Sequence, residues 1–293
     1  MRCKRLVTTY TEIGMLDKKV KVKDVRDLGA GNCLLTLNTP EQARLVRPGQ
    51  FVMIKCVEDT HGNPLLRRPF TIFNIHRQPR SGKPAGIELL VKDIGAGTHR
   101  LAQAHTGQSL DCLGPQGRGF QLPAEMRNRL GMACLVAGGV GIAPLYLLAQ
   151  SLITQNVKPV LFYGGAGIAD LVLREYFERL GMEIFCATED GSFGERGLVT
   201  QPLAQFLQNH PRKDIRLYAC GPWNMMKTVH ALSVQSGLQC EVSLEARMGC
   251  GLGACLGCVV RSRDSQGEER FLRVCQDGPV MNSRLIDWDT APL

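Results

Sequence analysis

Short apolar segments separated by Gly, Pro and Asn occupy the chain from about Lys18 to Pro123. These segments hold β-branched, leucine and aromatic residues, and they span 33–37, 51–55, 70–75 and 87–91. Evenly spaced short strands with turn signals between them are typical of a small antiparallel barrel. We therefore predict an antiparallel β-barrel over residues 1–125.

Beyond about Met126 the apolar segments alternate with helical patterns. The first predicted strand starts at Met132 and runs into a glycine-rich turn, and later strands are predicted at 160–165, 183–188 and 215–221. The predicted helices lie at 144–154, 169–180 and 223–236. This alternation predicts an α/β domain with a doubly wound parallel sheet, which we place at residues 126–238.

Charge and hydropathy argue against several classes of function. The chain carries a net charge of +8, but its 35 Lys and Arg residues are dispersed and only 6% of its residues are aromatic. A nucleic-acid partner is therefore less favoured than the phosphates of an anionic cofactor or an acidic protein partner. No apolar run is long enough to cross a bilayer, and the N-terminus lacks the apolar core of a secretory signal. We expect a cytoplasmic protein with no membrane partner.

Four of the 12 cysteines follow a metal-ligand spacing. Cys250, Cys255 and Cys258 are spaced C-x4-C-x2-C, and Cys275 follows after a longer gap, as in plant-type [2Fe–2S] proteins. Glycines interleave the first three cysteines and allow the backbone to turn its amides toward the sulfurs. A zinc ribbon and a disulfide cluster are the alternatives, but zinc sites usually combine two short-spaced pairs. The predicted cluster segment, residues 239–293, is too short for a core of its own, so we expect the bound cluster to order it.

The other eight cysteines show no framework spacing and lie mostly beside apolar residues. We predict that they are buried, reduced thiols, because free cysteine is among the most buried residue types in reducing compartments. They are Cys3, Cys33, Cys56, Cys112, Cys134, Cys186, Cys220 and Cys240.

Two motifs of the α/β domain are suited to a dinucleotide. A glycine-rich turn follows the first buried strand and opens a helix, where small residues and helix amides can receive a pyrophosphate. This turn comprises Gly138, Gly139, Val140, Gly141, Ile142, Ala143 and Pro144. It departs from the G-x-G-x-x-G pattern, so a tight structural turn is the alternative. Cys220, Gly221 and Pro222 end the last strand at the same edge of the sheet, where open sheets bind ligands. For Cys220 the alternative is a buried core residue.

Two motifs of the barrel combine cationic or hydroxyl side chains with stiff or glycine-rich backbone. The run from Arg67 to Thr71 carries guanidinium groups that can clamp a pyrophosphate and a hydroxyl that can bond a heterocycle. The run from Ile94 to His99 offers backbone amides and the Thr98 hydroxyl to a phosphate. A solvated turn is the alternative in both places.

In their order along the chain, these motifs resemble the ferredoxin–NADP reductase superfamily. The cysteine segment with its flanks, 243–250 and 274–280, is more specific and resembles the electron-transfer subunit of the two-subunit, NAD-linked (class 1B) dihydroorotate dehydrogenases. The resemblance covers about residues 18–288. It implies an FAD-binding barrel, an NAD-binding domain and a small C-terminal segment that holds a [2Fe–2S] cluster beside the flavin.

The resemblance also assigns residues to these cofactors. It implies that FAD is held by Arg68, Pro69, Phe70, Thr71, Gly97 and Thr98. It implies that NAD binds at the turn 138–144 and at Gly221 and Pro222. The catalytic positions would be Cys220, which packs against the nicotinamide and is not a nucleophile, and Glu245. Gly164, Gly165 and Ala166 stand where NADP-specific relatives often carry serine and arginine, so NAD is favoured over NADP.

Electron transfer between two subunits is a further implication of the resemblance. A partner catalytic subunit containing FMN, in a heterotetramer, would oxidise dihydroorotate in pyrimidine biosynthesis and pass electrons through the [2Fe–2S] cluster and FAD to NAD+. This chain itself shows no TIM-barrel repeat. We expect the partner to contact the basic cysteine-loop face, at Arg261, Arg263 and Arg273. The alternatives are an NAD(P)H–ferredoxin oxidoreductase or hydrogenase electron-transfer subunit, and a zinc-stabilised regulatory protein.

Overall fold

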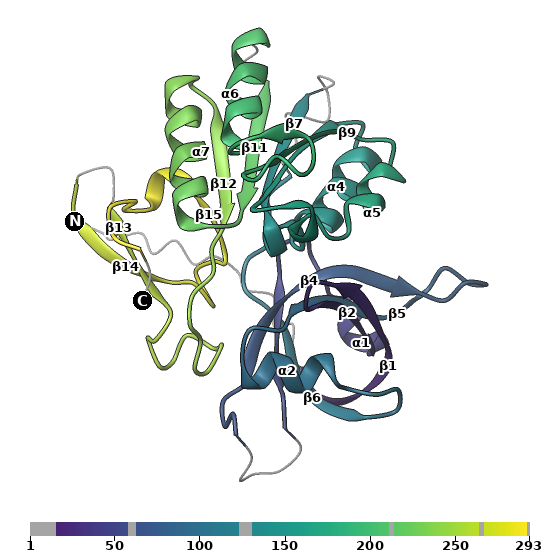
Figure 1. Ribbon diagram of the computed structural model, residues 1–293. Coiled ribbons are helices and arrows are strands. Elements are labelled where there is room, and N and C mark those ends of the chain that lie inside the picture. The colour runs from purple at the N-terminus through teal and green to yellow at the C-terminus, as the bar shows by residue number, and fades with distance from the viewer. Residues whose placement is uncertain (1–15, 58–62, 123–130, 211–213, 264–266, 292–293) are drawn as a thin grey trace.

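Six antiparallel strands close into a barrel, and seven further strands form a second sheet (Figure 1). The computed structural model describes residues 16–57, 63–122, 131–210, 214–263 and 267–291. The barrel elements in chain order are β1 (Asp17–Gly29), β2 (Asn32–Asn38), α1 (Pro40–Ala43), β3 (Phe51–Lys55), β4 (Arg68–Arg77), β5 (Pro84–Lys92), α2 (Ala96–Ala102) and β6 (Ser109–Gln116).

The barrel strands follow the spatial order β1-β2-β5-β4-β3-β6, and all their pairings are antiparallel. Alternate residues of a strand face the interior, because successive side chains of a strand point to opposite sides. Leu35 and Leu37 of β2 therefore share one buried cluster with Val52 and Ile54 of β3. Each predicted barrel strand lies within one observed strand, so the predicted antiparallel barrel is confirmed.

The second sheet is the predicted doubly wound parallel sheet. Its order is β10-β9-β8-β7-β11-β12-β15, and every pairing is parallel except that of β12 with β15. The chain builds the sheet outward from β7 in both directions, so the carboxyl ends of β7 and β11 flank a topological switch point. The strands are β7 (Met132–Gly138), β8 (Lys158–Gly165), β9 (Glu183–Thr188), β10 (Glu195–Arg196), β11 (Ile215–Cys220), β12 (Gln239–Ser243) and β15 (Val280–Asn282).

Helices cover both faces of this sheet (Figure 1). They are α4 (Leu145–Thr154), α5 (Arg174–Glu178), α6 (Thr200–Asn209) and α7 (Trp223–Gln235), with short turns η1 (Gly139–Ile142), η2 (Ile168–Asp170) and η3 (Ser283–Leu285). Leu135 of β7 packs with α4 and α5 residues, whereas its neighbour Val136 packs with α6 and α7 residues. β7 is buried on both faces, which explains its unbroken apolar sequence.

The cysteine segment lies beside both larger units. Its hairpin consists of β13 (Val259–Arg263) and β14 (Glu269–Arg273). Cys258 and Cys275 belong to the same buried cluster as Met53 of the barrel and Val242 of β12. Two strands from the predicted cluster segment, β12 and β15, extend the parallel sheet. The predicted boundary at 125/126 lies outside the described residues, and the division into three domains stays a prediction.

One predicted helix is much shorter than expected. The sequence predicts helix over 169–180, but the structure has η2 and then α5, which covers only Arg174–Glu178. Leu171, Val172 and Leu173 are buried, and Leu173 has a φ of 60°, in the left-handed region. These three apolar residues lie in a turn that packs against the core, and they do not form one face of a helix. Tertiary burial therefore overrides their helical pattern. Strands β1 and β6, helix α6 and the hairpin were not specified by the sequence pattern.

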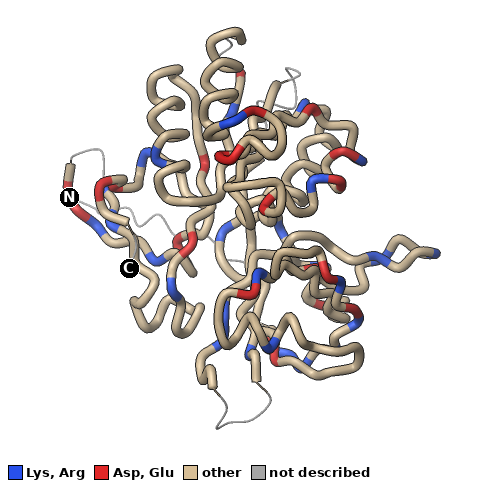
Figure 2. Tube along the Cα trace, viewed as in Figure 1, with Lys and Arg blue, Asp and Glu red and all other residues tan. Residues whose placement is uncertain are grey.

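Basic and acidic residues are interspersed over the described chain (Figure 2). This arrangement agrees with the dispersed charge expected from the sequence. Among the described residues, no helix combines the length and the apolar character that crossing a bilayer requires.

Candidate functional site

A cavity of about 730 Å³ opens at the carboxyl ends of β7, β8 and β11. Three predicted motifs line it: the turn at 138–141, the run 164–166 after β8, and Gly221 with Pro222 after β11. Ile142 and Ala143 are buried behind the turn. The fold therefore brings the two predicted dinucleotide motifs to one edge of the sheet, around a single cavity.

The two motifs touch through glycine. A Cβ atom at Gly141 would lie 2.3 Å from the Cys220 carbonyl oxygen, and one at Gly138 would lie 2.6 Å from Pro222 Cδ. No side chain larger than hydrogen fits at such distances. Glycine at these positions thus lets the β7 turn pack directly against the end of β11, and it exposes backbone to the cavity.

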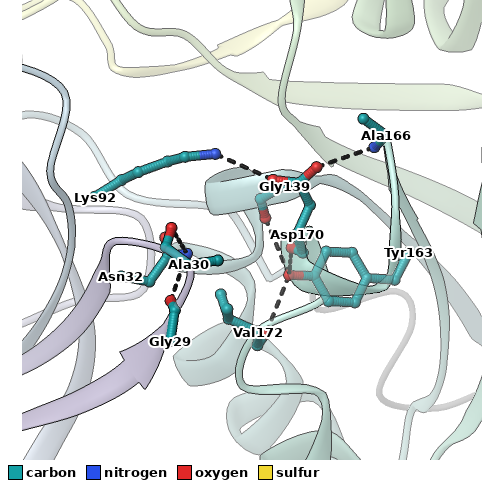
Figure 3. Close-up of polar contacts among 9 residues, drawn as sticks. All are labelled: Gly29, Ala30, Asn32, Lys92, Gly139, Tyr163, Ala166, Asp170 and Val172. Carbon is teal, nitrogen blue, oxygen red and sulfur yellow. Dashed lines mark hydrogen bonds and ion pairs between the residues drawn. The ribbon is translucent and has the colours of Figure 1, made fainter.

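A barrel residue also reaches this cavity. Lys92, at the end of β5, lines it and lies 3.1 Å from an Asp170 carboxylate oxygen in η2 (Figure 3). The other Asp170 oxygen accepts the Ala166 amide at 3.1 Å. The Lys92 hydrogen bond is the main cause that lowers the pKa of Asp170. The pair joins the barrel to the cavity wall of the sheet domain.

Tyr163 supports the same wall from inside the sheet. Its buried hydroxyl lies 2.9 to 3.2 Å from the carbonyl oxygens of Gly139, Asp170 and Val172 (Figure 3). Burial raises the pKa of Tyr163 well above its ordinary value, so the hydroxyl keeps its proton and can donate it to one of these three carbonyls at a time. Tyr163 thereby links the glycine turn to the loop after β8.

Cys220 and Glu245 occupy different positions relative to the cavity. Cys220 is 2% exposed and lies behind the cavity wall. Burial, followed by the nearby Glu245 charge, raises its pKa well above the ordinary value, whereas the Ser243 hydrogen bond lowers it. Glu245 lines the cavity, and although solvent reaches its side chain, the protein that surrounds it raises its pKa. A protonated, buried thiol fits the predicted packing role of Cys220 better than a nucleophilic one.

The backbone around the four predicted ligand cysteines points amides at sulfur. The Leu252 amide lies 3.3 Å from Cys250 Sγ, the Gly253 amide 3.1 Å from Cys275 Sγ, and the Cys275 amide 3.4 Å from Cys258 Sγ. The backbone turns through positive φ at Gly251 (70°), Gly253 (79°) and Leu256 (56°) to achieve this. Amide donors that favour thiolate sulfur are what a [2Fe–2S] cluster requires, so the loop fits that group.

The predicted ligand cysteines differ in their pKa shifts: burial, followed by the hydrogen bond with Cys258, raises the pKa of Cys275 to about 12. Burial acts to raise the pKa of Cys250, but amide hydrogen bonds led by that of Leu252 outweigh it and lower the pKa to about 6. Within the described chain, no three His, Cys, Asp or Glu side chains are placed to hold one metal ion.

Arg273 braces the cysteine loop. Its Nε and Nη2 atoms lie 3.0 and 3.2 Å from the two Asp277 carboxylate oxygens, and Nη1 donates to the Gly253 carbonyl at 3.3 Å. Arg261 and Arg263 pair with the buried Asp287 carboxylate at 4.0 and 3.3 Å. These three arginines were predicted to form a basic docking face, and in the structure they have intramolecular partners.

The two barrel motifs predicted for FAD lie next to one another. A Cβ atom at Gly97 would lie 3.4 Å from Arg68 Cγ. Thr98 Oγ1 accepts the amides of Ile94 and Gly95, both at 3.0 Å, and Arg68 donates to the Leu66 carbonyl at 2.8 Å. Pro69 and Thr71 are partly exposed on β4, whereas Phe70 faces the barrel core.

Exposed apolar side chains surround these motifs and support a ligand there. Leu65, Leu66 and Ile94 are 70%, 52% and 79% exposed. Apolar groups exposed beside a guanidinium and glycine-rich backbone suit a large planar cofactor that carries phosphates. The residues present therefore fit FAD.

Sequence reasoning missed several residues of the site. Lys92, Glu189 and Trp223 line the cavity, as do Asp170 and Ala291. They come from elements far apart in the sequence, and no motif links them. Only Trp223 carried a local signal, because it directly follows Pro222.

Known families match two parts of the chain. The iron–sulfur cluster binding domain of dihydroorotate dehydrogenase B matches residues 245–287, and the oxidoreductase NAD-binding domain matches residues 135–231. Among solved structures, one described as an NADH-dependent reduced ferredoxin-NADP oxidoreductase is similar with a TM-score of 0.77 and 28% identity, covering 92% of this chain and 90% of that chain. A ferredoxin–NADP+ reductase from Neisseria gonorrhoeae with bound FAD and NADP, at 19% identity and a TM-score of 0.60, shares the fold over 75% of this chain and 92% of its own.

Relatives of nearly full length carry one name. The dihydroorotate dehydrogenase B (NAD(+)) electron transfer subunit of Desulforamulus reducens is 35% identical over 92% of this chain and 97% of its own length. The subunit of the same name from Geobacillus thermodenitrificans is 39% identical over 85% of this chain and 90% of its own. The family that the cysteine segment and its flanks resemble is thereby confirmed: the chain belongs to the family of dihydroorotate dehydrogenase B (NAD+) electron transfer subunits.

Proposed function

We propose that this chain is the NAD-linked electron-transfer subunit of a dihydroorotate dehydrogenase and serves pyrimidine biosynthesis. The observation that carries the proposal is the position of the cysteine loop against the barrel. A Cβ atom at Gly251 of the loop would lie 2.5 Å from Met53 Cγ in β3. The loop is thus in van der Waals contact with the unit that fits FAD, and short distances favour electron transfer.

Three cofactors divide the chemistry when bound: nicotinamide carries hydride, a [2Fe–2S] centre carries single electrons, and FAD exchanges both. The chain supplies the binding sites and their order. Cys250, Cys255, Cys258 and Cys275 would hold the cluster, the motifs at 68–71 and 97–98 the flavin, and the cavity at the sheet edge the nucleotide. The buried Cys220 thiol and Glu245 would lie at the nicotinamide end of that cavity.

A preference for NAD over NADP is supported by acidic groups at the cavity. Glu189 and Asp170 line it together with the uncharged run 164–166. A 2′-phosphate would meet carboxylates there, whereas a free ribose hydroxyl can donate a hydrogen bond to one. The cationic Lys92 is already paired with Asp170.

The partner would be an FMN-containing dihydroorotate dehydrogenase catalytic subunit, in a heterotetramer. The surface best suited to it carries the exposed ligand Cys255 with Leu256 and Phe271, which are 60% and 63% exposed. Apolar side chains exposed around a redox centre favour a protein contact that excludes water. Leu256→Asp should weaken association with the catalytic subunit. If the catalytic subunit binds the wild-type chain and the Leu256→Asp variant with equal affinity, the interface lies elsewhere.

Free thiols support a cytoplasmic location. The described cysteines are all unpaired, and they include buried residues of both larger units, such as Cys112 and Cys134. Disulfides are rare where the cell keeps thiols reduced.

The decisive experiment is anaerobic purification followed by a visible spectrum and measurement of iron, sulfide and flavin. We expect about two iron atoms and one FAD per chain, in line with a [2Fe–2S] flavoprotein. The isolated chain should oxidise NADH with an artificial acceptor but should not turn over dihydroorotate. Colourless, iron-free protein, or dihydroorotate turnover by this chain alone, would refute the proposal.

A second candidate is an NAD(P)H–ferredoxin oxidoreductase subunit. It is favoured by the structural similarity to the NADH-dependent reduced ferredoxin-NADP oxidoreductase over nine-tenths of both chains. Both candidates use the same cofactors, so the partner distinguishes them. Co-purification with a dihydroorotate-oxidising subunit, identified by mass spectrometry, supports the first candidate, and co-purification with a ferredoxin-dependent partner supports the second.

A further inference from the structure

A tryptophan pair stands at the wall of the nucleotide cavity. Trp223, the first residue of α7, lines the cavity, and its ring centroid lies 4.8 Å from that of Trp288. The Trp223 indole N–H donates to the Trp288 carbonyl at 3.2 Å. Trp288 is 7% exposed, and its own N–H donates to the Ser283 carbonyl at 2.9 Å. The ring and the backbone carbonyl of Trp288 therefore both hold Trp223.

The segment that carries Trp288, residues 287–291, is anchored at Asp287 and at Asp289, and we call it the strap. At one end the Asp287 amide donates to the Arg261 carbonyl of β13 at 3.0 Å. Further along, Asp289 lies 2.8 Å from the Lys227 ammonium of α7. Beyond that pair Ala291 lines the nucleotide cavity. The strap thus runs from the hairpin of the cysteine segment to the cavity.

We propose that Trp288 is a positioning residue for the nicotinamide nucleotide, acting through Trp223 and the strap. The inference rests on the proposed function in one respect, that the cavity takes NAD(H). Because aromatic rings in contact favour a defined relative geometry, loss of the Trp288 ring removes the packing that orients Trp223 and leaves only the hydrogen bond to the backbone carbonyl. A less ordered Trp223 lowers the affinity for the nucleotide, because part of the binding energy must then be used to order the side chain.

The affinity for NADH of the cofactor-loaded protein tests the proposal, measured by calorimetry under anaerobic conditions after the flavin and the cluster have been chemically reduced, so that NADH binds without passing on its hydride. Trp288→Ala should raise the dissociation constant about tenfold, and Trp288→Phe should restore it to within about twofold of the wild-type value. Trp223 and Trp288 are the two tryptophans of the chain. In Trp288→Phe, Trp223 is therefore the sole tryptophan, and NADH should quench its fluorescence.

Phe206→Ala is the matched control. Phe206 is 8% exposed and stacks on His210, so it is a buried aromatic residue like Trp288, but it does not line the nucleotide cavity. Its loss should leave the dissociation constant for NADH within about twofold of wild type. If Trp288→Ala does not fold, Trp288→Leu, which keeps apolar volume without the ring, is measured instead.

The outcomes distinguish a failure of the proposed function from a failure of the positioning role of Trp288. If the wild-type protein does not bind NADH, the proposed function itself fails. If it binds, and the Trp288 variant binds equally tightly, Trp288 has no positioning role. Equal losses in the Trp288 and Phe206 variants, or bound NADH without quenching of Trp223, would also overturn the inference.

Discussion

The Lys92 ammonium of the barrel lies 3.1 Å from the Asp170 carboxylate of the sheet domain, at the rim of the nucleotide cavity. Both side chains are partly exposed, at 38% and 27%, so solvent screens the attraction. We expect Lys92→Ala to lower the free energy of unfolding by about 0.5 kcal/mol. The substitution should change the position of the cavity wall at Ala166 more than it changes stability, because the Ala166 amide donates to the same Asp170 carboxylate.

The pH dependence of this pair has a defined sign. The pKa of Asp170 is lowered in the folded protein, so its contribution is present above the ordinary value of 3.8 and is lost as the pH falls through the folded pKa. The stability difference between wild type and Lys92→Ala, from urea unfolding, should stay constant from pH 8 to about pH 5 and shrink below about pH 4. A difference that grows on acidification would contradict the ion pair.

Gly141→Ala should damage the nucleotide site more than Gly139→Ala. At Gly141 the new methyl would lie 2.3 Å from the Cys220 carbonyl, and the two turns must separate, at a cost of about 3 kcal/mol. At Gly139 the methyl meets nothing within 4 Å, and only the φ of 52° opposes it, at about 1 kcal/mol. Thermal unfolding and NADH affinity measure both variants. Equal effects would show that the close approach to Cys220 is unimportant.

Cys275→Ser should remove the iron and leave the flavin. The Cys275 sulfur accepts the Gly253 amide inside the loop, and serine is a poor iron ligand by comparison. Iron content should fall to less than about one-tenth of wild type, because binding and ordering of the loop are coupled. Cys134→Ser, in buried strand β7, is the control and should keep its iron. If the Cys275→Ser variant keeps its iron, Cys275 is not a ligand of the cluster.

Glu245→Gln should flatten the pH dependence of NADH binding. Surrounding protein raises the Glu245 pKa, so in the wild type the group loses its proton at a higher pH than an ordinary glutamate and then places a negative charge in the cavity. Affinity for the anionic nucleotide should fall as the pH rises through that raised pKa, and the glutamine variant should not show the fall. Calorimetry between pH 5 and 8 tests this. Parallel pH profiles of the two proteins would exclude Glu245 as the titrating group.

The sequence by itself determined the chemistry of the local motifs and the type of each unit. Cysteine spacing, the glycine turn and the alternation of apolar residues each involve only a few neighbouring residues. A given local conformation requires the same residue types in any protein, so such patterns can be recognised from sequence. The antiparallel barrel and the parallel sheet follow from such signals, and the family was predicted from the resemblance of the motifs to a known family. Periodicity failed at 171–173, where burial in the core competes with helix formation.

Only the tertiary structure decided which distant residues share the site. Lys92, Asp170 and Trp223 meet at one cavity because the barrel docks beside the switch point of the sheet, and no local pattern encodes that docking. The same holds for Trp288, whose contact with Trp223 spans 65 positions of sequence. Packing brings such residues together through the summed burial of many side chains, and for that reason their pairing could not be predicted from short-range pattern.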